Sequence, residues 1–332
     1  MEGLEKIIER KGKRFLFKVE SSEDQNDYSK YEELREEIWG FPEDNMAGIR
    51  NMICENFFHE GSSLFIAVFS EAEEGGFARQ DRAHLVGFSY GYVGVKDKEI
   101  AFRSVDNLQF FSMYTGVRED FQNFGLGILI KKFQRVKLID LFGVYSSTCT
   151  YDPLTGVNAY RNIHHLRMEV MEYKVALYAD FGGRLNRRDI PSDRFVMSWD
   201  LREEPQRPVL DVKSLFEKKQ VVTEVEQAEI KRMGGLLELD IIQGVNIDLD
   251  HEFLLIEIPF DFFQMLRETD VEDQRIREIP LEWRLKTRKA FQSYLHRGYK
   301  VFDFKSIRIN NRQRDFYILK KLKSNQESYH EI

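Results

Sequence analysis

The stretch VREDFQNFGLGILIKKFQ, residues 117–134, contains two glycines directly before a well-patterned helix. Glycine destabilises a regular helix or strand by roughly 0.5–1 kcal/mol relative to alanine, so glycines at a junction indicate a special backbone shape. Apolar side chains repeat on one face of the predicted helix, which we expect to end near Leu141. Either Gly125 and Gly127 form only a tight turn before this helix, or they let an anion approach the backbone.

The start of a helix is suited to an anion because its first N–H groups lack partners and the helix dipole is positive there. Four N–H groups would be open to a phosphate, those of Gly125, Leu126, Gly127 and Ile128. Lys131 and Lys132 follow closely. The spacing matches neither a P-loop nor the dinucleotide-binding glycine pattern. The pattern alone supports an anion site and a plain turn equally.

The segments around this stretch predict a mixed α/β domain. We expect strands at residues 15–20, 63–70, 84–95, 108–117 and 143–151, and two closing strands between residues 169 and 201. We expect helices at residues 28–39 and 45–58, the helix of the opening stretch, and a short helix at 158–166. The strands at 63–117 are expected to be antiparallel, whereas the strand–helix–strand order after them implies a parallel pair.

Residues 202–208 predict a domain boundary, because two prolines and mixed charges occur there without periodicity. We therefore expect a first domain over residues 1–202 and a smaller α+β domain of unknown role over residues 203–332. The second domain is predicted to contain strands at 252–260, 299–309 and 314–321, with a helix at 280–297 that begins with proline. The expected fold class is α/β (α+β), with a mixed central sheet flanked by helices.

Composition excludes several classes of protein. The net charge of −7, spread over mixed signs, argues against a nucleic-acid partner. The N-terminus is too charged for a signal peptide, and no apolar run approaches the roughly 20 residues of a membrane span, so we expect a cytoplasmic protein without a membrane partner. Cys54 and Cys149 have apolar neighbours and are predicted to be buried thiols rather than a disulfide. A homo-oligomer is left open.

The spacing Gln122-x-x-Gly125-x-Gly127 after Val117 resembles the acyl-CoA pyrophosphate signature of the GNAT N-acetyltransferase superfamily, [QR]-x-x-G-x-[GA] after a strand. The element order predicted over residues 15–201 is similar to the order in that family. Two further segments, TYDPLTGVNAYRNIHHL and IPSDRFVMSWDL, resemble an uncharacterised two-domain branch of the superfamily. The resemblance implies a GNAT-like fold for the first domain.

The resemblance also implies a cofactor, acetyl-CoA or CoA, and the residues that bind it. The pyrophosphate would be held by the backbone of Gln122, Asn123, Phe124, Gly125, Leu126, Gly127 and Ile128. The pantetheine would be held by amides of the preceding strand, around Tyr114, Thr115 and Val117. Asn158, at the head of the next helix, matches a position that often contacts the cofactor. Strands that splay beyond this point would open the acyl slot.

The expected catalytic residues match the family's pattern less well than the cofactor-binding residues do. Acetyl transfer to an amine needs a base and an acid, but the family's tyrosine position falls near Ile163, and no glutamate occurs at residues 108–117. Tyr160 and His164 are candidate substitutes, and the alternative is that His164 and its neighbour are surface histidines. Adjacent helical residues point about 100° apart, so at most one of the two faces the slot. Asp152 is a candidate base, or equally a turn cap before a proline.

Ser192, Asp193 and Arg194 form a cluster at a strand start. They could bind an acceptor, or they could form a turn with an ion pair. No third ligand accompanies the adjacent histidines, so no metal site is expected. We expect acyl-CoA-dependent N-acyltransfer to a small amine or amino-acid-like acceptor by direct attack, because no activated nucleophile is evident. The alternatives are a non-catalytic acyl-CoA sensor and an interaction scaffold that shares only the fold.

Overall fold

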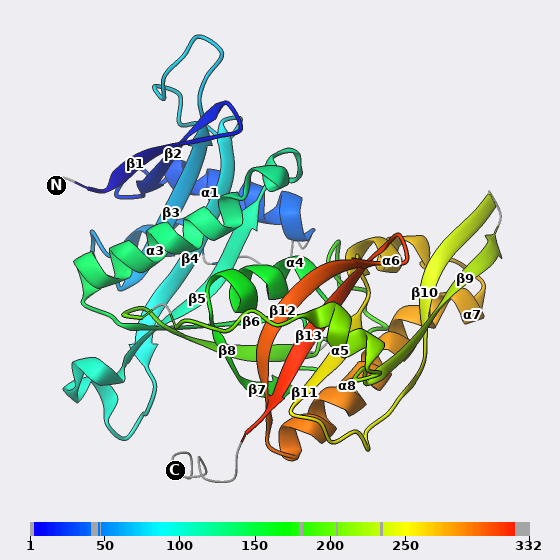
Figure 1. Cartoon of the computed structure of the whole chain (residues 1–332). Coiled ribbons are helices and arrows are strands. Elements are labelled where there is room, and N and C mark those ends of the chain that lie inside the picture. Colours follow the sequence, from blue (N-terminus) through cyan, green and yellow to red (C-terminus); the bar gives the residue numbers. More distant parts are fainter. Residues whose placement is uncertain are drawn as a thin grey trace. The chain divides into compact units, whose positions relative to one another are not determined.

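The computed structural model describes residues 3–40, 46, 48–178, 182–203, 205–232 and 235–322. The chain divides into two compact units (Figure 1). The first unit comprises Met1–Cys149, Gly182–Leu185 and Ser198–Glu204, and the second comprises Thr150–Phe181, Asn186–Met197 and Pro205–Ile332. One division, between Glu204 and Pro205, falls within the segment 202–208, but Thr150–Phe181 and Asn186–Met197 also belong to the second unit. In these segments Asp152 and Asp193 bind Arg284 and Arg288 of the later chain.

The main sheet has eight strands in the order β1-β2-β3-β4-β5-β6-β8-β7. The elements of the first unit are β1 (Glu5–Arg10), β2 (Lys13–Val19), α1 (Asn26–Trp39), α2 (Ile49–Glu55), β3 (Ser63–Ser70), β4 (Leu85–Val95), the short helices η1 (Ala101–Arg103) and η2 (Val105–Asn107), β5 (Leu108–Val117), η3 (Glu119–Phe124) and α3 (Leu126–Phe142). Two strands, β6 (Ser146–Tyr151) and β8 (Arg194–Asp200), run from one unit into the other.

Helices cover both faces of the first unit's strands. α1 lies on one face, where the Tyr31 ring packs 6.1 Å from the Phe88 ring. α3 lies on the other face, where Phe133 packs 6.0 Å from Phe17. Because both faces are covered, β3 is buried over Ser63–Phe69 and reads as a continuous apolar run rather than an alternating one.

The second unit contains α4 (Gly156–Ala159), η4 (Tyr160–His165), β7 (Glu169–Lys174), α5 (Val212–Glu217), β9 (Thr223–Arg232), β10 (Gly235–Val245), β11 (Phe253–Ile258), α6 (Phe262–Glu268), α7 (Gln274–Arg277), α8 (Ile279–His296), β12 (Tyr299–Ile309) and β13 (Arg312–Lys321). β11, β13 and β12 form an antiparallel sheet, and β9 and β10 form a hairpin. α8 packs on one face of that sheet through Phe291 and Tyr317. α5 packs on the other face through Phe216 and Phe316.

The predicted fold class, a mixed sheet flanked by helices followed by a smaller α+β part, is confirmed. The strands predicted at 63–70 and 108–117 have those bounds. The helix predicted at 45–58 corresponds to α2, which spans Ile49–Glu55, and residues 45 and 47 lie outside the described residues. The helix predicted at 158–166 begins earlier, as α4, and continues as the π-helical turn η4. The strand β1 and the helices α6 and α7 were not predicted.

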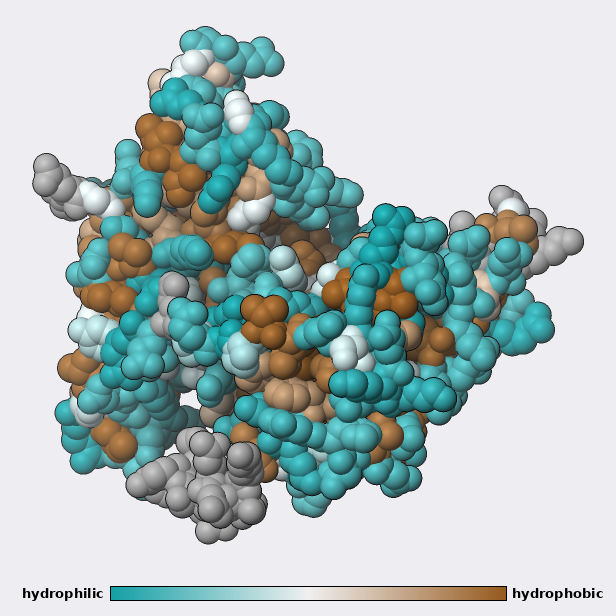
Figure 2. All heavy atoms as spheres, in the orientation of Figure 1, coloured by the Kyte–Doolittle hydropathy of each residue, from teal (hydrophilic) through white to brown (hydrophobic). Residues whose placement is uncertain are grey.

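The surface drawn in Figure 2 is mostly hydrophilic, with separate hydrophobic patches between the polar residues. No helix in the described ranges is long and apolar enough to cross a membrane. Neither Cys54 nor Cys149 is in a disulfide. Cys54 is exposed and Cys149 is half-buried, so the prediction that both thiols are buried is wrong.

Candidate functional site

Strand β5 departs from regular pairing at Met113. Tyr114 lies opposite Tyr90, and Ser112 lies opposite Gly91, so Met113 is the extra residue of a β-bulge. Gly91 permits this bulge, because a Cβ there would lie 2.3 Å from the carbonyl oxygen of Phe111. An extra residue turns the side chains that follow it to the opposite face of a strand, so the bulge changes which residues of β5 face α3.

One edge of β5 becomes open beyond the bulge. β5 pairs in parallel with β6 at only two positions, Phe110 and Phe111. The N–H of Arg118 donates to the carbonyl oxygen of Val86 at 2.8 Å, so Arg118 is hydrogen-bonded to its β4 neighbour. In an antiparallel pair of strands, hydrogen-bonded and non-hydrogen-bonded residues alternate. Thr115 and Val117 therefore turn their N–H and C=O groups away from β4, toward the side where β6 no longer pairs. These are backbone groups that could bind the amides of an extended ligand.

The glycine turn, residues 125–127, follows β5 and the short helix η3. Gly125 has φ 71° and ψ 18°, the left-handed conformation that favours glycine, and α3 begins at the next residue. The N–H of Ile128 donates to the carbonyl oxygen of Gly125, but in the described part of the chain no acceptor is paired with the N–H of Gly125, Leu126 or Gly127. A Cβ at Gly125 would meet no atom within 4 Å. Three consecutive N–H groups thus lie without a described acceptor at the positive end of a 17-residue helix, and Gly125 among them is exposed.

Lys131 does not lie at the turn, although it follows closely in sequence. It is only 2% exposed, and its Nζ donates to Ser112 Oγ and to Gln134 Oε1. Gln134 Nε2 in turn donates to Ser89 Oγ at 2.8 Å. This buried polar network ties α3 to β4 and β5 at the bulge. Lys132 is exposed.

Two lysines of the β1–β2 hairpin lie beside the glycine turn, and the sequence analysis missed them. Lys13 Nζ lies 5.4 Å from the centre of the Phe124 ring, and Lys11 Nζ lies 5.9 Å from it. Phe15 packs on the same ring at 5.4 Å. The sequence KGK between two strand-like runs could have indicated this hairpin. Lys11 and Gly12 form its turn, with φ 48° and 74°.

These features fit an acyl-CoA. A pyrophosphate requires N–H donors that no side chain shields, and Gly125 and Gly127 have no side chain. The amides of a pantetheine arm require a strand edge that no other strand pairs with, and Thr115 and Val117 provide one, although the carbonyl oxygen of Val117 accepts Gln122 Nε2 at 3.4 Å. The elements β2, α1, α2, β3, β4, β5, α3, β6, α4, β7 and β8 also follow one another in the order that the resemblance implies. The fold is GNAT-like.

No family profile and no curated protein sequence matches the chain. Solved structures that are similar to it include the ribosomal-protein-S5-alanine acetyltransferase of Vibrio fischeri, with 10% identity and a TM-score of 0.42 over 61% of this chain and 100% of that one. NAA60 of Arabidopsis thaliana, in complex with a bisubstrate analogue, has 10% identity and a TM-score of 0.41 over 56% of this chain and 98% of that one. The ribosomal-protein-S18-alanine N-acetyltransferase of Escherichia coli has 11% identity and a TM-score of 0.38 over 58% and 99%. We infer no activity from these similarities.

Asp152, a candidate base, lies in the second unit within a cluster of arginines. Arg284 donates to both of its carboxylate oxygens, and Arg194 Nη1 lies 3.4 Å from one of them. The same carboxylate accepts the N–H of Leu154 at 2.9 Å, and the carbonyl oxygen of Asp152 accepts the N–H of Thr155 at 3.0 Å. The contacts are those of a buried ion pair that also caps a turn.

The predicted acceptor loop is buried, with Ser192 at 2%, Asp193 at 0% and Arg194 at 7% exposure. The Ser192 hydroxyl accepts the N–H of Tyr178 at 2.9 Å. Asp193 accepts hydrogen bonds from Arg288 Nε and from the Tyr173 hydroxyl, at 2.8 and 2.7 Å. These contacts describe a turn held by ion pairs, which is the alternative that the sequence left open.

The remaining predicted residues lie on α4 and η4. Asn158 is half-buried and its Nδ2 donates to Thr155 Oγ1 at 3.0 Å. Tyr160 is 40% exposed, and its ring stacks on the His164 ring at 5.0 Å. His164 Nδ1 lies 3.0 Å from Asp303 Oδ1. Sequence reasoning missed Asp303, because it lies 139 residues further along the chain.

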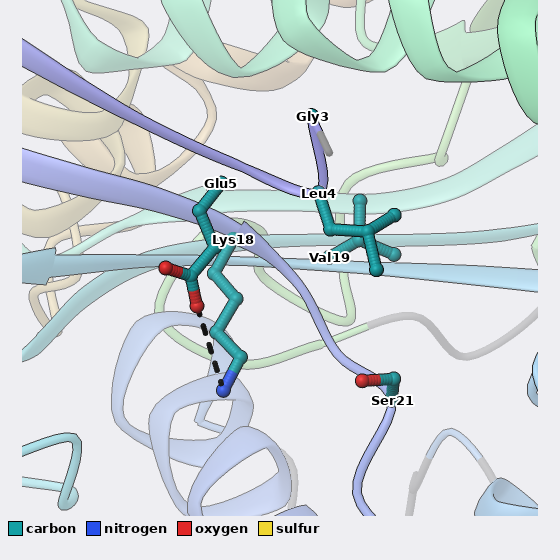
Figure 3. Close-up of a pocket in the computed structure, with 6 residues that line it drawn as sticks. All are labelled: Gly3, Leu4, Glu5, Lys18, Val19 and Ser21. Atoms are coloured by element: carbon teal, nitrogen blue, oxygen red, sulfur yellow. Dashed lines mark ion pairs between the residues drawn. The ribbon is translucent and has the colours of Figure 1, made fainter. Parts of the chain in front are cut away.

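Two hollows lie away from the predicted residues. One, of about 350 Å³, lies in the first unit. It is lined by Gly3, Leu4, Glu5, Lys18, Val19 and Ser21, which Figure 3 draws. Another, of about 670 Å³, lies in the second unit beside α5 and the β12–β13 turn. Neither is lined by a predicted site residue. Within the described ranges, no three histidine, cysteine, aspartate or glutamate side chains gather to hold a metal ion.

Proposed function

We propose that this protein binds acyl-CoA through the first unit and transfers its acyl group, which we expect to be acetyl, to the amine of a small or amino-acid-like acceptor. The observation that carries the proposal is the run of three N–H groups, at Gly125, Leu126 and Gly127, that have no acceptor in the described chain and that follow the exposed, left-handed Gly125. Every helix start leaves such amides without partners, but here Gly125 and Gly127 also lack side chains that would keep a phosphate away from the positive end of a long helix.

Each part of the ligand has a candidate partner in the chain. The three amides would bind the pyrophosphate, and the backbone edge of Thr115 and Val117 would bind the pantetheine amides. Acyl-CoA would supply the acyl group as a reactive thioester. Lys131 would hold the bulged strand in place, because its Nζ donates to Ser112 Oγ directly before the bulge.

A direct attack of the acceptor amine on the thioester is the mechanism that suits these residues. A covalent acyl-enzyme would need a nucleophile beside a base that activates it. Cys149, the thiol on β6, is half-buried, and the sequence around it shows no pattern of an activated nucleophile. The acceptor itself stays an expectation from the resemblance.

Thermal unfolding with CoA and acetyl-CoA tests the proposal. A ligand that binds only the folded chain at 100 times its Kd stabilises the fold by about 2.7 kcal/mol, which raises Tm measurably. Gly125→Asp should abolish this rise, because it places a carboxylate at the pyrophosphate position.

The matched control is Gly143→Asp at the other end of α3. Gly143 also has a left-handed backbone, with φ 61°, and a Cβ there would also meet no atom within 4 Å. Both variants therefore carry similar backbone strain, but only Gly125→Asp should lose the response to CoA. No rise in Tm for the unmodified chain at millimolar CoA would refute the proposal. A rise without transfer to any amine of a broad panel would favour the sensor alternative.

A further inference from the structure

The larger of the two hollows, of about 670 Å³, is lined by α5, the first residues of β9 and the β12–β13 turn. All the described residues that line it belong to the second unit, so it shares no residue with the proposed CoA site. α5 lies against β11 and β12 of the same unit (Figure 1). Ligand sites for small molecules have volumes of about 300–1,000 Å³. The hollow is therefore large enough for one small molecule.

Positively charged residues predominate along this hollow. One of its lining residues, Glu217, is acidic and four are cationic, namely Lys213, Lys219, Arg308 and Arg314. The chain as a whole has a net charge of −7, so the charge balance is locally reversed here. A concave surface with charges of one sign attracts ligands of the opposite sign. The hollow therefore favours an anion.

Arg314 of β13 is held in place at this hollow. Its Nε and Nη2 donate to the two carboxylate oxygens of Glu257, whose side chain is 2% exposed. Its guanidinium lies 4.7 Å from the centre of the Phe216 ring of α5. The Arg314 side chain is 14% exposed, and no acceptor in the described chain is paired with its Nη1. A guanidinium that is already held binds an anion with a smaller loss of conformational entropy.

Hydrogen bonds of the chain fix the walls of the hollow. The turn between β12 and β13 consists of Asn310 and Asn311, which have φ 48° and 62°, as in the type I′ turns that fit twisted strands. Arg308 Nε donates to the carbonyl oxygen of Asn311 at 3.3 Å and so helps to hold this turn. On the opposite wall, the N–H of Val222 donates to the carbonyl oxygen of Leu255 at 2.8 Å, which attaches the segment before β9 to β11.

The remaining lining residues are largely apolar. Phe216, Val221, Val225 and Ile309 are each partly exposed at the hollow. Such side chains favour a ligand whose apolar part they can remove from water. A bare inorganic ion would leave them uncovered. The cations and the apolar residues together indicate an anion that carries an apolar body.

We propose that this hollow is a binding site for a small aromatic anion, which is a carboxylate or a phosphate ester. The guanidinium of Arg314 and the ammonium groups of Lys213 and Lys219 bind the anionic head group. Phe216 and Val221 pack against the aromatic ring. Binding here does not require the proposed CoA site, because the two sites have no residue in common.

Calorimetric titration of the full chain with 1-naphthoate and with 1-naphthyl phosphate tests the proposal. At least one of them should bind with a Kd of about 1 mM or lower, and the tighter of the two identifies the head group. Two probes serve as controls: 1-naphthalenemethanol has the ring without the charge, and inorganic phosphate has the charge without the ring. Each should bind at least about tenfold more weakly. No binding of either aromatic anion, or equal binding of the uncharged ring or of bare phosphate, would overturn the proposal.

Charge-reversed variants locate the bound anion. Lys213→Glu combined with Lys219→Glu should raise the Kd about tenfold or more, because two exposed cations at the hollow become anions. The matched control is Lys218→Glu combined with Lys289→Glu, which changes the net charge equally at exposed lysines that do not line the hollow. This control should change the Kd little. Arg314→Lys keeps the charge but removes the planar guanidinium, and it should also weaken binding. Equal losses in the control and in the hollow variant would overturn the proposal.

Gly125→Asp separates this site from the proposed CoA site. The variant should bind the aromatic anion as tightly as the unmodified chain does, because Gly125 does not line the hollow. If Gly125→Asp lost this binding, the anion would belong to the glycine turn and the hollow would have no ligand of this class. A chain that failed to bind CoA but bound the aromatic anion would refute the proposed function and leave this site standing.

Discussion

Arg284 of α8 holds Asp152 in a bidentate ion pair, although 132 residues separate the two in sequence. Arg284 is 0% exposed and Asp152 is 8% exposed. Burial raises the pKa of Asp152, but the guanidiniums of Arg284 and Arg194 outweigh burial and hold that pKa below its ordinary value. A buried carboxylate with such partners contributes to stability only while it is ionised.

Asp152→Asn should therefore destabilise the chain by about 3–5 kcal/mol at pH 7, because it leaves Arg284 buried without a counter-charge. The folded pKa is depressed, so the stabilisation is present above the unfolded value of about 3.9 and is lost as pH falls through the lower folded value. Urea unfolding should thus show that the difference in unfolding free energy between the variant and the unmodified chain becomes smaller below about pH 4.

Asp200→Asn is the control, because Asp200 and Arg202 form an exposed pair. This variant should lower the unfolding free energy by less than about 1 kcal/mol. Equal losses in both variants would contradict this account.

A chain that ends at residue 202, the predicted boundary, should not fold cooperatively. Asp152 would lose Arg284, and Asp193, which is 0% exposed, would lose Arg288. Each broken buried pair costs about 3–5 kcal/mol, and together they approach the roughly 5–15 kcal/mol that holds a domain together. Near-ultraviolet circular dichroism and urea unfolding of the fragment measure this. A sharp transition with native aromatic signals would show that residues 1–202 fold alone.

Local signals predicted much of the first unit. β3 and β5 were found with their observed bounds because apolar runs mark strands, and the glycine turn was found because glycine marks unusual backbone. β1 was missed because its residues, EKIIER, are mostly exposed and charged, so burial left little pattern. A strand on the edge of a sheet can form with few apolar residues when its neighbour supplies the pairing.

Long-range pairs could not be predicted in this way. No local pattern near Asp152 indicates Arg284, and none near His164 indicates Asp303, because tertiary packing alone brings each pair together. For the same reason the sequence did not indicate that Asp152 and Asp193 belong to the second compact unit. The proline-rich segment at 202–208 marks a real change in the chain, but Asp152 and Asp193 bind α8 beyond it.

Asp315 of β13 should make the protein less stable as pH rises. Burial, at 4% exposure, raises the pKa of this carboxyl from 3.8 to about 6. The folded state therefore binds the proton more tightly than the unfolded state, so stability is lost between about pH 4 and pH 6 and stays lower above that range. By the relation of about 1.4 kcal/mol per pH unit, the loss is on the order of 3 kcal/mol.

Asp315→Asn should remove that loss, because asparagine stays neutral. Urea unfolding at pH 4, 5, 6 and 7 should show a smaller decline for the variant than for the unmodified chain. Asp248→Asn, at an exposed position of the same unit, is the control and should follow the unmodified chain. A parallel decline in Asp315→Asn and the unmodified chain would place the pH dependence elsewhere.

Lys11 and Lys13 should strengthen CoA binding without contacting the acyl group. Both lie over the Phe124 ring, directly before the glycine turn, and both are exposed. Exposed charges of this kind contribute up to about 1 kcal/mol each at low salt. Replacing both with glutamate should therefore raise the Kd of CoA about tenfold or more in calorimetry at low salt. The effect should shrink in 0.5 M salt, because the Debye length there falls well below the roughly 10 Å found at 0.1 M.

The control is Lys6→Glu, which changes an exposed lysine on β1 of the same hairpin. This variant should change the Kd of CoA little. An equal effect of Lys6→Glu would show that net charge alone, rather than the place of Lys11 and Lys13 beside the turn, sets the affinity.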